Sequence, residues 1–233
     1  MPAKSFTLKN IGVVTVSKRR GAKRLNLRVS GDKIMVSQPV WLPYAVGVQF
    51  ALSHNKWIDD QRSKQPYFEI KDGLNIGKTR VLRIASDNNL RTRIGEDAVT
   101  IFIPPHLNTK SPDVLRVAVQ AIKRALKSES TNLLPSRLEA LASKYDFTYR
   151  TVSCKSMKTR WGSCTNDKKI TLNIFLMMVP WELIDYVLLH ELAHTKHLHH
   201  GKAFWDSIEA IMPDYKERRK KLKNLQSAIA PLY

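Results

Sequence analysis

The sequence is poor in cysteine, in acidic residues and in long apolar runs, and these shortages exclude several classes of protein. Its two cysteines, Cys154 and Cys164, are too few for a disulfide framework, so we expect reduced thiols. The apolar run from Ile174 to Trp181 is far shorter than the ~20 residues of a membrane-spanning helix. The N-terminal segment shows no readable export signal. We therefore expect a soluble, cytoplasmic protein that does not associate with membranes.

Acidic residues are scarce beside the basic ones. The chain has 39 Lys and Arg against 20 Asp and Glu, which gives a formal net charge of +19. This excess makes a polyanion, such as a nucleic acid or a nucleotide, or an acidic surface a possible partner. A solvated basic surface with no such partner is the alternative, because many basic proteins bind no nucleic acid.

The pattern of apolar residues predicts an α+β fold. Alternation over residues 6–38 is typical of a small antiparallel meander, and residues 43–64 have the spacing of one amphipathic helix. Short strands follow up to residue 105. From about residue 111 the pattern is mainly helical, with a strand on either side of a loop near residues 155–169. The sequence thus predicts a β-rich N-terminal region with one helix over residues 1–105 and a second domain over 106–233.

The residues His190, Glu191 and His194 form the pattern H-E-x-x-H on a predicted helix. Histidines four residues apart lie on one helix face, so both imidazoles can reach one metal ion. Glu191 projects beside such an ion and not onto it. That is the position of a general base for a metal-bound water, whose pKa the metal lowers towards about 7. The pattern therefore predicts a zinc site.

A catalytic zinc site needs a third protein ligand, and the sequence offers His197, His199 and His200. On a straight helix His197 would lie about 10 Å along the axis from His190, too far to share one ion. Gly201 allows the chain to break just after His200, and the resulting spacing matches that of metalloproteases whose third histidine lies just past the helix. This chain departs from them at His197, where they have a turn-making glycine. We expect His200 to be the third ligand.

Three separated motifs, "MKTRWGSC", "ITLNIFLMMVPWELIDYVLLHELAH" and "HHGKAFW", resemble the YgjP-like family of metal-dependent hydrolases. This family is similar in its active-site pattern to SprT-type zinc peptidases. The resemblance implies a zincin-like catalytic domain with zinc on His190, His194 and the histidine that matches His200, and Glu191 as the catalytic acid and base. The family usually has Asn before the third histidine where this chain has His199, so the choice between His199 and His200 stays open.

The loop "TRWGSC" contains a second candidate, Arg160, and the resemblance places this loop near the site. Its guanidinium group is suited to hold a substrate carboxylate, a phosphate or a developing oxyanion. The alternative is that Arg160 pairs with a surface acid while Trp161 packs in the core. We include Arg160 among the catalytic candidates and expect Cys164 to be a buried thiol.

The sequence supports three hypotheses for function. The first is a zinc-dependent hydrolase, a metallopeptidase that acts on peptides or proteins with a metal-bound water activated by Glu191. The second is a hydrolase of nucleotides or other phosphoanhydrides, and the third is a nucleic-acid-associated protein with a zinc site. The sequence identifies neither the substrate nor the oligomeric state.

Overall fold

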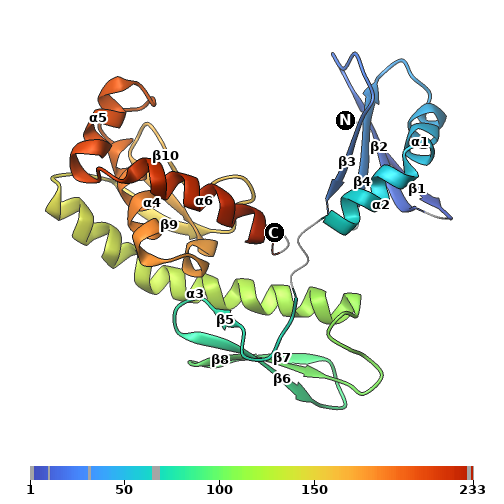
Figure 1. Cartoon of the computed structure of the whole chain (residues 1–233), viewed down its shortest axis with the longest axis horizontal. Coiled ribbons are helices and arrows are strands. Elements are labelled where there is room, and N and C mark those ends of the chain that lie inside the picture. Colours follow the sequence, from blue (N-terminus) through green and yellow to red (C-terminus); the bar gives the residue numbers. More distant parts are fainter. Residues whose placement is uncertain (1–2, 10, 31–32, 65–68, 230–231, 233) are drawn as a thin grey trace. The chain divides into compact units, whose positions relative to one another are not determined.

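The computed structural model describes residues 3–9, 11–30, 33–64, 69–229 and 232. The chain forms two compact units, residues 1–67 and residues 68–233 (Figure 1). Helices and strands are both abundant, which confirms the α+β class. No described helix is both long enough and apolar enough to cross a lipid bilayer.

The first unit is a four-stranded sheet with two helices. Its elements are β1 (Ala3–Leu8), β2 (Gly12–Arg19), β3 (Asn26–Ser30), β4 (Lys33–Pro39), α1 (Tyr44–Ser53) and α2 (Asn55–Lys64). The strand order is β1-β2-β4-β3, with β2 and β4 parallel, so the predicted antiparallel meander is wrong. The most deeply buried strands lie in the centre, where Val14 and Val16 of β2 pair with Ile34 and Val36 of β4. Burial of these side chains accounts for the central position of β4.

The single helix predicted over residues 43–64 is in fact two helices, α1 and α2, separated at His54. The Nδ1 atom of His54 lies 2.8 Å from the carbonyl oxygen of Phe50, and the Ser53 hydroxyl donates to the same oxygen at 3.0 Å. In a continuing helix the carbonyl oxygen of Phe50 would accept a backbone N–H group. Here the two side chains contact it instead, and such local bonds compete with helix propagation.

The second unit is built around one long helix. Its elements are β5 (Asn75–Ile76), β6 (Arg80–Ser86), β7 (Arg91–Ile94), β8 (Ala98–Ile103), α3 (Pro112–Lys144), β9 (Thr151–Lys155), β10 (Gly162–Cys164), β11 (Lys169–Asn173), the 3-10 turn η1 (Ile174–Met178), α4 (Trp181–Ala193), α5 (Lys202–Ile211) and α6 (Tyr215–Ile229). Helix α3 contacts the sheet β5-β6-β8-β7 and also contacts β9, η1 and α4 (Figure 1). Both sets of contacts bury apolar residues of α3, so this helix joins two layers.

The boundary between the compact units follows residue 67, whereas the sequence suggested a division after residue 105. The difference arises from strands β5 to β8, which the sequence pattern places in the N-terminal region. Their buried residues Leu82, Val99 and Ile101 belong to the same core as Val114 and Ala118 of α3. A sheet that buries its apolar face against α3 belongs to the unit of that helix.

A buried carboxylate, Glu129 of α3, fixes the turn between β5 and β6. Its side chain is 4% exposed and accepts hydrogen bonds from the backbone N–H groups of Lys78 and Thr79, at 2.9 Å each, and from the Thr79 hydroxyl at 2.8 Å. Gly77 makes this approach sterically feasible, because a Cβ atom there would lie 1.8 Å from Oε2 of Glu129. The turn is therefore tied to the central helix by polar contacts.

Substitution of Gly77 tests this anchor. Gly77 has φ +75° and Gly73 has φ +79°, but a Cβ atom added at Gly73 would meet nothing within 4 Å. A positive φ costs an alanine roughly 1–2 kcal/mol, and displacement of a hydrogen-bonded buried carboxylate costs about 1–3 kcal/mol more. Gly77→Ala should therefore lower the free energy of unfolding clearly more than Gly73→Ala, as measured by urea denaturation. Equal losses in the two variants would contradict the anchoring role of Glu129.

Candidate metal centre

Helix α4 positions the first two histidines. Pro180 precedes the helix and Glu182 lies in its first turn, both of which favour helix initiation. The apolar side chains of α4 are buried in the core of the second unit: Leu183, Ile184, Val187, Leu188, Leu189, Leu192 and Ala193. This packing fixes the rotation of the helix about its axis. His190 and His194 therefore lie one turn apart on the face that borders a cleft.

The third histidine, His200, returns to this face because α4 ends at Ala193. Residues 194–201 lead back to the start of α5, and Nε2 of His200 lies 3.0 Å from Nε2 of His190 and 3.1 Å from Nε2 of His194. The ligand atoms of these three side chains all lie within 4.8 Å of one another. The described side chains of His197 and His199 are not part of this cluster.

The donor set fits one metal ion. Two imidazole nitrogens bound tetrahedrally to zinc at about 2.1 Å stand about 3.4 Å apart, close to the separations between His200 and its two neighbours. His194 also has the hydrogen-bond partner expected of a ligand, since its Nδ1 lies 3.1 Å from the carbonyl oxygen of His197. This contact favours the tautomer that leaves Nε2 of His194 unprotonated. The buried Nδ1 of His190 has no such partner among the described residues.

Burial keeps the three imidazoles neutral. It lowers the pKa of His190 to about 3, with further lowering by His194, His200 and Arg219. Burial is also the main cause of the lowered pKa values of His194 and His200. Because only the neutral imidazole binds a metal ion, the protein environment favours the binding form at neutral pH.

Aromatic side chains of α5 and α6 surround the histidines. The ring of Phe204, which is fully buried, lies 4.9 Å from the ring of His190, and the ring of Trp205 stacks on that of His200 at 5.4 Å. Tyr215 in turn stacks on Trp205 at 5.3 Å. The contact between Trp205 and Tyr215 depends on the packing of α6.

Glu191 packs directly against strand β10. Its side chain is 5% exposed, and a Cβ atom at Gly162 would lie 2.5 Å from Oε1 of Glu191. Burial raises the pKa of Glu191 to about 8, and the positive charge of Arg160 opposes that rise. Gly162 thus allows the carboxyl group to lie beside the strand, a role that the sequence did not reveal.

The loop that precedes β10 is held by Asn173, a fully buried residue at the end of β11. Its Nδ2 donates to the carbonyl oxygens of Met157 at 2.7 Å and Arg160 at 2.8 Å, and its Oδ1 accepts from the backbone N–H of Phe175 at 3.3 Å. Trp161 is buried, as the sequence suggested. No local sequence pattern distinguishes Asn173 from a surface asparagine, so its role is visible only in the structure.

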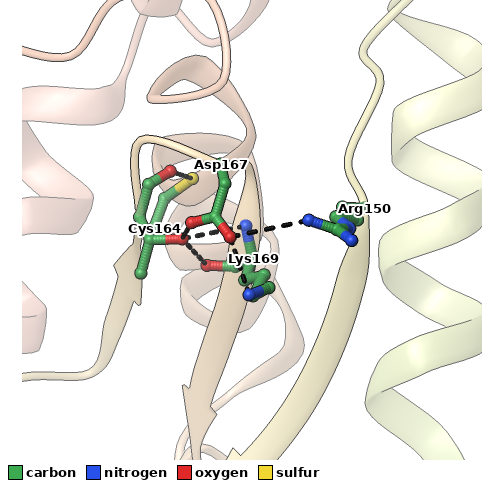
Figure 2. Close-up of polar contacts among 5 residues, drawn as sticks. Arg150, Cys164, Asp167 and Lys169 are labelled. Atoms are coloured by element: carbon green, nitrogen blue, oxygen red, sulfur yellow. Dashed lines mark hydrogen bonds and ion pairs between the residues drawn. The ribbon is translucent and has the colours of Figure 1, made fainter.

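The turn between β10 and β11 is fixed by polar contacts around Asp167 (Figure 2). Its carboxylate accepts a hydrogen bond from Thr165 at 2.7 Å and pairs with Lys169 at 2.7 Å and more distantly with Arg150 at 3.8 Å. The hydrogen bonds from Lys169 and Thr165 lower the pKa of Asp167 to about 2. Cys164 follows Ser163 at the end of β10, where burial raises the pKa of its thiol to about 11. The thiol is therefore protonated at neutral pH.

The family model for the YgjP-like metallopeptidase domain matches residues 23–225, most of the chain. The chain belongs to the YgjP-like family. It is accordingly a metal-dependent hydrolase of a metallopeptidase family. The family match confirms the resemblance noted in the sequence.

Two crystal structures show weak similarity to this YgjP-like protein. The metallopeptidase zymogen abylysin of Pyrococcus abyssi is 23% identical with a TM-score of 0.37, over 40% of this chain and 93% of that one. The metallopeptidase zymogen jannalysin of Methanocaldococcus jannaschii is 22% identical with a TM-score of 0.34, over 37% of this chain and 90% of that one. No curated protein matches the chain.

The three histidines of the YgjP-like protein open into a cleft of about 830 Å³. Its walls are α4, α6, strand β10 and the preceding loop, and both Glu191 and Arg160 line it. Arg160 is exposed and has no ion-pair partner among the described residues. The alternative role considered for it, pairing with a surface acid, is therefore not observed among these residues. All five residues proposed from the sequence, His190, Glu191, His194, His200 and Arg160, therefore meet at one cleft.

Substitution of Gly162 by alanine tests the contact with Glu191. The added methyl group would overlap the carboxyl group, and overpacking of this kind costs typically 1–3 kcal/mol. We expect Gly162→Ala to displace Glu191 and to lower hydrolytic activity at least tenfold, while metal content measured by elemental analysis stays unchanged. Gly201→Ala is the matched control, because a Cβ there meets nothing within 4 Å. Full activity in Gly162→Ala would show that the position of Glu191 is not restricted by the strand.

Proposed function

We propose that this YgjP-like protein is a zinc-dependent peptidase that uses His190, His194 and His200 as metal ligands and Glu191 as general base. The observation that carries the proposal is the convergence of three neutral imidazoles and one buried carboxyl group at a single cleft. Three histidines with an open side are the donor set of catalytic zinc sites. When bound, zinc would supply a Lewis acid and lower the pKa of a coordinated water.

Glu191 is suited to move protons in this cleft. It follows His190 directly on α4, its carboxyl group lies beside Gly162, and it lines the same cleft as the three histidines. Burial favours the protonated form of Glu191, whereas Arg160 and a metal ion bound by the histidines would favour the carboxylate. That carboxylate would take a proton from the attacking water and return it to the leaving amine. The packing of Glu191 against β10 keeps the carboxyl group in one orientation, so this transfer needs no rearrangement of the side chain.

Strand β10 supports a peptide as the substrate. The strand order β10-β11-β9 leaves β10 at an edge of its sheet, and Gly162, Ser163 and Cys164 all line the cleft. An edge strand offers backbone N–H and C=O groups to which an extended peptide can add as a further strand. A peptide bound in this way would run past the histidine cluster.

Arg160 is the candidate for substrate binding on the same side of the cleft. Its backbone is fixed through the bond from Asn173, and its side chain is exposed in the cleft lining. A guanidinium group there can hold a substrate carboxylate or stabilise a developing negative charge on a carbonyl oxygen. We therefore propose a role in binding or charge stabilisation for Arg160.

A second candidate function is hydrolysis of nucleotides or other phosphoanhydrides. The observation that favours it is the excess of basic side chains in the cleft lining, which also suits a phosphate group. An activity screen of the metal-loaded protein should therefore contain nucleotides beside peptides.

Metal binding should depend on three histidines only. His190→Ala, His194→Ala and His200→Ala should each reduce zinc content strongly, because a tetrahedral site with two remaining protein ligands is weak. His197→Ala and His199→Ala, the matched controls, should retain about one zinc per chain in elemental analysis. Similar losses in all five variants would indicate a loose histidine patch and not a defined site.

Glu191→Gln separates a chemical role from a structural one. Glutamine has nearly the same volume but cannot take the proton from water, and a positioned base contributes typically 10²- to 10⁴-fold to rate. The variant should therefore retain zinc and thermal stability while its turnover of a cleaved peptide falls by about that factor. Turnover equal to that of the parent would exclude Glu191 as the base, and loss of zinc together with activity would make it a ligand.

A further inference from the structure

Helix α6 gives the cleft a basic wall. Four cationic residues of this helix line the cleft: Lys216, Arg219, Lys220 and Lys223. Their spacing of three, four and seven residues from the first places them on one helix face. Together with Arg160 they make five cationic side chains among the described lining residues, against one acidic residue, Glu191, whose carboxyl group is buried. The cleft surface is therefore strongly positive.

The basic residues on the rest of α6 differ from these in one respect: they are neutralised by nearby acids. Arg218 pairs with Asp214 at 2.8 Å, and Lys221 pairs with Glu217 at 2.7 Å. Neither Arg218 nor Lys221 lines the cleft.

The cations that face the cleft are mostly unpaired. Lys216 is the exception, since it pairs with Glu209 at 3.3 Å. Arg219 lies over the ring of Trp205 at 5.0 Å, and no described acid pairs with Arg219, Lys220 or Lys223. Unpaired like charges on one helix face repel one another. Their repulsion is relieved when a negatively charged ligand binds.

The spacing of these charges matches an extended peptide. The row of unpaired cations from Arg219 to Lys223 is about 6 Å long at 1.5 Å per residue. Alternate side chains of an extended peptide lie on one side, about 6.6 Å apart. Residues of β10 and of this row line the same cleft, so two acidic side chains at alternate positions of an extended peptide match the row in spacing. The phosphates of a nucleic acid could also pair with these cations. A nucleic acid cannot, however, form the backbone hydrogen bonds by which a peptide adds to the edge of β10.

We propose that the cleft selects acidic peptide segments, with the backbone along β10 and alternate acidic side chains opposite Arg219, Lys220 and Lys223. This specificity rests on the proposed peptidase function and adds the class of its substrate. The cations of α6 bind and orient the peptide, whereas His190, His194, His200 and Glu191 serve the reaction.

The test uses two fluorogenic decapeptides that are identical except for Glu or Gln at alternate positions. Exposed ion pairs each contribute roughly two- to fivefold, so the metal-loaded protein should cleave the Glu peptide about tenfold more efficiently, measured as kcat/KM at low salt. In Lys220→Gln/Lys223→Gln this preference should fall to about twofold or less. The matched control Lys71→Gln/Lys221→Gln, which removes the same charge outside the cleft, should keep it. Higher salt should weaken the preference of the parent.

Equal cleavage of both peptides by the parent, or a preference that survives in Lys220→Gln/Lys223→Gln, would overturn the proposed selectivity and leave the peptidase function intact. Failure to cleave either peptide would count against the peptidase function instead. In that case the dissociation constants of the two labelled peptides for the Glu191→Gln variant, measured by fluorescence anisotropy, test the selectivity without cleavage. A single-stranded DNA oligonucleotide that binds more tightly than the Glu peptide, through Lys220 and Lys223, would overturn the assignment to peptides.

Discussion

The close contact between Glu191 and the backbone of Gly162 is the constraint on which the site depends. It sets the distance between α4 and β10, because a side chain at position 162 would overlap the carboxyl group. It removes that carboxyl group from solvent, which raises its pKa, and gives it one orientation. It also brings the free edge of β10 next to the histidines. At this separation the strand and the buried carboxyl group line one cleft.

Buried polar side chains hold irregular segments of the second unit. Asn173 binds the carbonyl groups of the loop before β10, and Glu129 binds the N–H groups of the turn after β5. Loops have few repeating hydrogen bonds of their own, so their buried backbone groups need partners from side chains. Asn173 lies on β11 and Glu129 lies on α3, so each hydrogen-bonded segment is fixed to a helix or a strand.

The net charge of the chain does not distinguish basic residues that are paired with acids from unpaired ones that line the cleft. On α6, Arg218 and Lys221 are paired with acids one turn away, and such exposed pairs add little to stability or binding. Lys220 and Lys223 lie in the cleft and have no described acidic partner. Composition gives only the sum of these charges. The direction in which each side chain points determines which of them a ligand meets.

The sequence by itself determined the features that depend on near neighbours in the chain: the α+β class, the long helix of residues 112–144, and the common face of His190 and His194. A helix repeats every 3.6 residues, so a local pattern suffices for these. Only the tertiary structure decided the order of the strands in the first unit, the contact of Gly162 with Glu191 and the bonds of Asn173 to the loop before β10. Those contacts join segments that are distant in the sequence, and the burial of whole faces selects among many pairings that local patterns leave equivalent.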